Sequence, residues 1–152
     1  MTHADDLRAW AKGSYTTEAA TELLLRAFGG RFAAAGQPWV TPAGTSPEGY
    51  EENAWINFRE LAAEADSGAY SGGERRFLLL AASLVEDVPV VLGDVVPGLD
   101  RVNLDLVLAA VAHAGGSHQH SNIETKEDGS MVLHRGYLDA LYPWPQASPA
   151  AS

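Results

Sequence analysis

Apolar residues recur at helical spacing in five stretches of the chain. In residues 71–85, the apolar residues Phe77, Leu80, Ala81 and Leu84 follow the 3.6-residue period of a helix. Further apolar residues flank this stripe, which predicts a central helix that is buried over much of its surface. The other predicted helices cover residues 5–11, 16–28, 58–65 and 101–114.

Polar residues with capping ability precede several of these stretches. Ser71 and Glu74 have the spacing of a capping box, in which each side chain accepts a hydrogen bond from the other residue's amide. Asn57 and Asp100 stand where N-caps are expected, and the threonine at position 16 or 17 is the predicted cap of the second helix. These helix starts are therefore specified locally.

Extended structure is predicted in three places. Residues 36–53 are rich in Pro and Gly, so they form a loop, and its flanks at 38–40 and 54–56 are expected to pair as a small ribbon. Residues 88–96 are rich in valine, which fits a short strand or an irregular buried segment. One or two last helical turns are expected in residues 137–142.

A β-hairpin is predicted near the C-terminus. Asp128-Gly129 is a type I′ turn signal between strands at residues 122–127 and 130–135. In that register one face of the hairpin carries Ile123, Thr125, Val132 and His134.

These elements define the expected fold and domain organisation. The predicted class is α+β, predominantly α, with about five helices packed in one domain and a small β-hairpin. A length of 152 residues suits one hydrophobic core. Residues 1–142 are predicted to form a single globular domain, and residues 143–152 to form a Pro/Ala-rich C-terminal tail.

Charge and composition limit the classes of possible binding partner. Twenty acidic residues against ten basic ones give a net charge of −10, which disfavours nucleic acids and anionic membranes and favours a protein with a basic surface. The alternative is that the charge serves solubility alone. The chain has no cysteine and no apolar run of membrane-spanning length, and its N-terminus lacks a secretory pattern, so a cytoplasmic location is expected.

Residues 71–100 resemble part of an ABC-type ATPase domain. The sequence Ser71-Gly72-Gly73-Glu74 resembles that family's signature loop, residues 90–94 resemble its Walker B strand, and Gly98-Leu99-Asp100 resembles its D-loop. That resemblance implies a nucleotide-binding ancestry. However, the chain contains no Walker A motif to hold phosphates, and Val95 stands where the catalytic carboxylate is expected. Helix capping by Ser71 and Asp100 accounts for the same residues without a nucleotide.

Three histidines form the second candidate site. His113, His118 and His120 lie within eight positions, and His134 is expected nearby across the hairpin. Two histidines at i and i+2 on a strand point to one side and can share a zinc ion. The alternative, and our prediction, is that these are solvated loop histidines and that the protein needs no metal or other cofactor.

Four tryptophans provide the remaining candidates. Trp10 and Trp55 stand in apolar patterns and are predicted to lie in the core. Trp39 and Trp144 stand beside prolines outside regular elements, so they are the predicted partner-binding anchors. The alternative is that each ring clips its own segment onto the domain.

The segments 4–27, 71–83 and 99–120 are similar to small uncharacterised proteins of actinobacteria, a resemblance that implies source and compartment but no activity. No complete catalytic motif is present, which favours a protein without enzymatic activity. The function expected from the sequence is an acidic protein-interaction module: an inhibitor, an immunity-type protein or a regulatory partner of a basic protein. A DNA-mimic protein and a degenerate ABC-like or His-based metal-dependent protein are the alternatives, and homo-oligomerisation stays open.

Overall fold

The computed structural model describes residues 1–146, without the side chains of residues 120–122, 134 and 135. The protein is a predominantly helical α+β fold. In the described chain the helices are α1 (His3–Ala11), α2 (Tyr15–Arg26), α3 (Phe58–Ala65), α4 (Gly72–Ser83), α5 (Leu92–Val95) and α6 (Arg101–Ala114), with 3-10 segments at Ala27–Ala33 and Val96–Gly98. The five longer helices confirm the predicted ones, whereas α5 replaces the short strand expected in residues 88–96.

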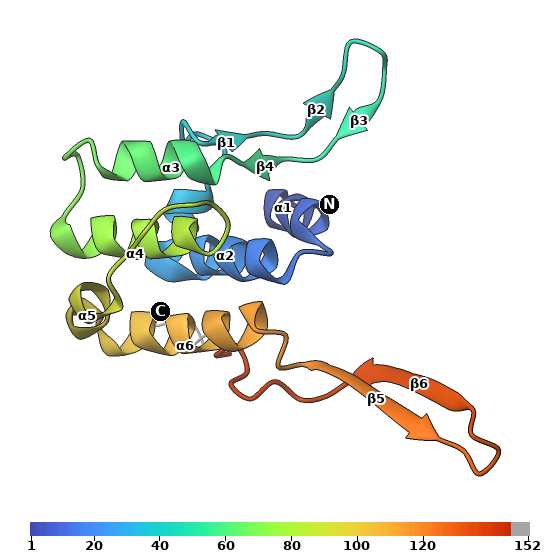
Figure 1. Cartoon of the computed structure of the whole chain (residues 1–152). Helices are drawn as coiled ribbons and strands as arrows, with labels where there is room; N and C mark the ends of the chain where they lie inside the picture. Colours follow the sequence, from blue (N-terminus) through green and yellow to red (C-terminus); the bar gives the residue numbers. More distant parts are fainter. Residues whose placement is uncertain (147–152) are drawn as a thin grey trace.

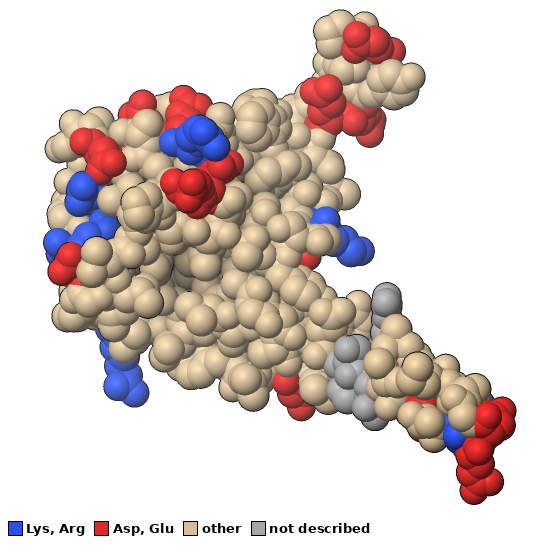
Figure 2. All heavy atoms as spheres, viewed as in Figure 1, with Lys and Arg blue, Asp and Glu red and all other residues tan. Residues whose placement is uncertain are grey.

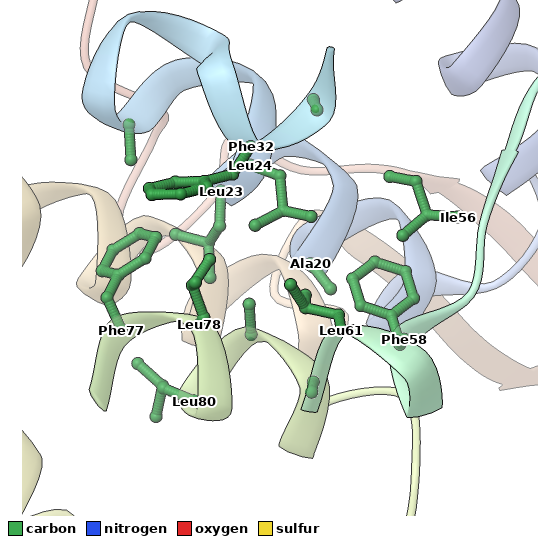
Figure 3. Close-up of a cluster of buried hydrophobic side chains, with 14 of the residues drawn as sticks. Ala20, Leu23, Leu24, Phe32, Ile56, Phe58, Leu61, Phe77, Leu78 and Leu80 are labelled. Atoms are coloured by element: carbon green, nitrogen blue, oxygen red, sulfur yellow. The ribbon is translucent and has the colours of Figure 1, made fainter. Parts of the chain in front are cut away.

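The helices pack in three layers. Figure 1 shows α3 on one side of the layer formed by α2 and α4, and α6 on the other side. Helix α1 packs against α2 at the end of this stack. The side chains between the layers are fully or almost fully buried, and those drawn in Figure 3 include Leu23, Leu24, Phe58, Leu61, Phe77 and Leu78. The predicted central helix is confirmed as α4, which packs against both α2 and α3.

The predicted caps are present with one exception. Ser71 and Glu74 form the reciprocal capping box of α4, with N–H to oxygen distances of 3.1 and 3.2 Å. Asn57 caps α3 and Asp100 caps α6, each by accepting an amide hydrogen bond. Helix α2 begins earlier than predicted, because Ser14 is its N-cap and accepts from Thr17.

The chain kinks inside the 3-10 segment Ala27–Ala33 that follows α2. Phe28, Gly29 and Gly30 all have positive φ angles, of 52°, 67° and 77°. A Cβ at Gly30 would lie 3.0 Å from the carbonyl oxygen of Leu25, so the turn needs glycine there. The strained Phe28 is held by edge contacts with two aromatic rings, Phe32 and Phe77, at 5.3 Å each.

Six short strands form three antiparallel pairs in the described chain. Strand β1 (Val40–Thr41) pairs with β4 (Trp55–Ile56), which confirms the predicted ribbon. Strand β2 (Gly44–Thr45) pairs with β3 (Glu51–Glu52), and β5 (Gln119–Thr125) pairs with β6 (Met131–Tyr137). Both outer hairpins project from the helical layers, as Figure 1 shows.

The β5–β6 hairpin corrects the predicted turn and register. Gly129 has a φ of 85°, but Asp128 has no positive φ, so a type I′ turn is excluded. The Lys126 N–H instead donates to Ser130 and its carbonyl accepts from Gly129, which encloses a three-residue loop. The longer loop shifts the pairing by one residue, so Ile123 faces Leu133 and Thr125 faces Met131. Val132 and position 134 therefore lie on the opposite face from Ile123 and Thr125.

The segment after β6 also departs from expectation. Residues 138–142 are not helical, because β6 continues to Tyr137 and the chain then runs back along α6. Within the predicted tail, Trp144 packs against the core and the Pro145 carbonyl accepts from Arg26 at 3.0 Å. Residues 147–152 lie outside the described residues. None of the helices in residues 1–146 has the length and apolar character needed to cross a membrane.

Candidate functional site

The first projecting feature is the acidic arm, which we define as residues 42–54 with strands β2 and β3. Glu48, Glu51 and Glu52 are all exposed on it, and the segment contains no Lys or Arg. The side chain of Tyr50 stands among these carboxylates with 72% of its surface exposed. In Figure 2 the arm is the protrusion at the upper right, where the acidic side chains gather. An exposed aromatic ring surrounded by negative charge is a suitable contact for a basic surface.

The acidic arm is closed by its own turn and held at its base by the body. The Ser46 N–H donates to the Tyr50 carbonyl at 2.7 Å, and the Tyr50 N–H donates to the Ser46 hydroxyl at 3.0 Å. At the base, the Ala54 N–H donates to the carboxylate of Asp6 in α1. The arm is therefore placed by hydrogen bonds at both of its ends.

Trp39 lies at the root of the acidic arm and is not a surface residue. The predicted exposure of Trp39 is wrong, because 0% of its surface is accessible and its indole N–H donates to the Phe32 carbonyl at 2.7 Å. Phe32 and Tyr70 surround the ring. Conversely, Trp55 was predicted to be buried but is 40% exposed, since it stands on the outer side of the ribbon. Trp39 therefore clips its segment to the core and offers no surface to a partner.

The second projecting feature is the apolar arm, which we define as residues 119–137 with strands β5 and β6. Directly opposed residues share a face, so the observed register gathers four large side chains on one side of the hairpin. Their exposed fractions range from 50 to 85%, and they are Ile123, Met131, Leu133 and Tyr137. This face is a row of apolar side chains that the described part of the chain leaves largely uncovered.

The tip of the apolar arm is acidic. Glu127 and Asp128 are exposed there beside Lys126, and Figure 2 shows the acidic cluster at the lower right. The Ser130 hydroxyl and N–H both donate to the Asp128 carboxylate, at 2.6 and 2.9 Å. These two hydrogen bonds lower the pKa of Asp128 below its ordinary value.

Trp144 lies half-buried over a small pocket between α1, α2 and α6. The Arg26 guanidinium sits 5.0 Å from the centre of the Trp144 ring, and Glu22 bridges Arg26 and Arg8 at 2.7 and 2.6 Å. Burial of Glu22 opposes its ionisation, but the hydrogen bonds from both arginines outweigh this, so the pKa of Glu22 is lowered. The pocket encloses about 280 Å³. Trp144 thus has a clear structural role, and a partner-binding role for it stays a prediction.

Two of the three candidate metal ligands lie together. The rings of His113 and His118 stack at 4.4 Å with an interplanar angle of 13°, and Tyr15 meets both rings edge-on. The Nε2 atom of His113 is engaged by a carboxylate oxygen of Glu18 at 2.7 Å. The side chain of His120 lies outside the described residues. Within the described part, no group of three potential ligands converges on one point.

Comparison with known proteins adds no relative to this picture. The chain matches no protein-family model, no curated protein and no solved structure.

The sequence reasoning missed both exposed surfaces. Tyr50 had a usable signal, since a large aromatic residue between Pro/Gly and Glu residues has no apolar neighbours to bury it. The apolar face of the hairpin could be predicted only if the number of residues in the loop was known. A shift of one residue in the pairing exchanges the two faces.

Proposed function

We propose that this protein is a non-enzymatic acidic protein-interaction module whose partner presents a basic surface. The observation that carries the proposal is the pair of arms, which project toward the same side of the helical body and both end in acidic residues (Figures 1 and 2). Arms of this kind suit an inhibitor, an immunity-type protein or a regulatory partner.

Each arm supplies what the other lacks. The three glutamates of the acidic arm attract a basic surface over a distance set by the ionic strength, and this steering raises the association rate. Specific, slowly dissociating binding also needs desolvated apolar contacts. The apolar arm offers them through Ile123, Met131 and Leu133, and Tyr50 adds an aromatic anchor on the acidic arm.

The charge distribution favours a protein partner over mimicry of DNA. A DNA mimic needs carboxylates in a continuous track at phosphate-like spacing. On the face shown in Figure 2 the acidic residues instead form separate clusters, divided by uncharged surface. A basic cytoplasmic protein is therefore the partner class that we propose, in keeping with the absence of cysteine.

The test is affinity capture from the native cell at low and high salt, with variants that separate the arms from the body. Tyr50→Ser and Leu133→Ser are the arm variants. Leu108→Ser is the matched control, because Leu108 is 43% exposed on α6, away from both arms. We expect the same basic protein to be captured by the wild type and the control and to be lost from both arm variants. The proposal fails if capture is independent of the arms, or if the captured material is nucleic acid.

A further inference from the structure

Arg76 of α4 has no hydrogen-bond or ion-pair partner among the described residues, and it lies beside a pocket that α4 forms with residues 89–95. Its Nε atom is buried. Its neighbour Arg75 differs, since it pairs with Asp66 at 2.6 Å.

Two glycines leave room for the Arg76 guanidinium. A Cβ at Gly72 would lie 3.4 Å from Nη1, and a Cβ at Gly98 would lie 3.3 Å from Nη2. A Cβ at Gly98 would press on the guanidinium, whereas one at Gly72 would lie at ordinary van der Waals distance from it. The group is therefore held between two backbone segments, which fixes the direction of its planar fork of donors.

The pocket beside Arg76 has the size and lining of a small-ligand site. It is open to solvent, has a volume of about 580 Å³, and combines Arg75 and Arg76 with the single acid Asp94, which gives the lining a net positive charge. Its remaining wall is largely apolar and includes Leu79, Val90 and Val91. A planar guanidinium recognises a carboxylate through two parallel hydrogen bonds.

We propose that this pocket binds a small organic acid, with its carboxylate on Arg76 and its hydrocarbon body against the apolar wall. The N-terminal end of α4 does not take part, because the side chains of Ser71 and Glu74 already occupy each other's amides. The recognition is made by the Arg76 guanidinium, whose Nε has no hydrogen-bond partner among the described residues. This proposal is independent of the partner-binding arms.

The test is an NMR titration that observes the Nε–H signal of Arg76, assigned by its loss in Arg76→Gln. The probe is 4-methylpentanoate, and the neutral control ligand is 4-methylpentanamide at equal ionic strength. We expect a saturable shift with the acid and no comparable shift with the amide. Arg76→Gln should weaken binding of the acid by about tenfold or more.

Arg75→Gln is the matched variant, because it removes the same charge from the same lining but leaves Arg76 in place. We expect it to keep most of the affinity. An equal loss in both variants, or an equal response to the acid and the amide, would overturn the proposal. If Arg76→Gln does not fold, as judged by circular dichroism, the wild-type Nε–H response to the two ligands decides the question alone.

Discussion

The acidic arm and the apolar arm are attached to the helical body in different ways. The acidic arm grows out of the β1–β4 ribbon, where Val40 and Ile56 are buried and Trp39 is fully enclosed. The apolar arm follows α6 after Gly115-Gly116, and hydrogen bonds of the backbone hold its base, such as that from Leu138 to His118 at 2.8 Å. One arm is therefore rooted in the core, whereas the other depends mainly on its own strand pairing.

Because of this difference, the two arms depend on the core of the protein to different degrees. The acidic arm has small strands of two residues each, and the core that fixes it lies at its root. The apolar arm has strands of seven residues, and its large side chains are exposed, so they contribute little to folding of the described chain. An isolated two-stranded hairpin is marginally stable in water. A partner that covers its apolar face would supply the burial that the arm lacks.

The largest predicted effect is a loss of stability on substitution of Trp39, at the root of the acidic arm. Trp39→Ala should lower the free energy of unfolding by about 3 to 5 kcal/mol, because it leaves a cavity in the core and an unsatisfied Phe32 carbonyl. Denaturant unfolding followed by circular dichroism measures this. Trp55→Ala is the control, and its cost should stay below about 1 kcal/mol, since the ring is 40% exposed. An equal loss of unfolding free energy in the two variants would contradict the attachment of the acidic arm to the core through Trp39.

Helical elements were predictable because their information is local. The apolar stripe of residues 71–85 and the caps at Ser71, Asn57 and Asp100 specify helix positions within a few residues of each start. The hairpin was predicted for the same reason, from Asp128-Gly129. Its register was not, because the same Asp-Gly signal occurs in loops of two and of three residues, and these pair the strands in different registers.

Burial of the tryptophans was less predictable because it depends on contacts distant in sequence. Trp39 is buried by Phe32 and by Tyr70, which arrives 31 positions later along the chain. Trp55 stands between Ala54 and Ile56, both buried, but alternation along the strand turns its ring outward. For Arg76, no sequence pattern indicates that its Nε–H lacks a hydrogen-bond partner.

The next largest effect concerns the apolar arm and the partner. The double variant Ile123→Ser with Leu133→Ser should raise the partner's dissociation rate by roughly thirtyfold, since two opposed apolar contacts are lost. The free energy of unfolding should change by less than about 0.5 kcal/mol, because both residues are at least half exposed. Surface plasmon resonance with the captured protein measures the rates. Unchanged dissociation would show that the apolar face lies outside the interface.

A smaller effect is expected from the charges of the acidic arm. Replacing Glu48, Glu51 and Glu52 together by glutamine should lower the partner's association rate by about tenfold at low salt, with little change in dissociation. The difference should shrink as salt screens the field. The control makes the same change in net charge on α3 and the loop after α4, with Glu60→Gln, Glu64→Gln and Asp87→Asn. If this control slows association equally, the association rate depends on the total charge of the protein and not on the position of the charges in the acidic arm.

The smallest effect tests whether the two arms open independently of each other. Gly129 and Gly49 both have positive φ angles, of 85° and 91°, and a Cβ at either would meet no atom within 4 Å. Alanine at either position therefore introduces backbone strain without a clash, at a local cost of about 1 kcal/mol. Such a cost corresponds to about a fivefold change in the population of the open arm.

Hydrogen exchange of the backbone amides distinguishes the arms. In Gly129→Ala we expect amides of β5 and β6 to exchange about fivefold faster, while amides of β2 and β3 and of the helices keep their rates. In Gly49→Ala the acceleration should appear in the acidic arm and spare the apolar arm. Because each variant is the control for the other, faster exchange in both arms from one substitution would show that the arms are coupled through the body. In that case the apolar arm is not an independently opening hairpin, and its exposed face is held ready for a partner by the same core that holds Trp39.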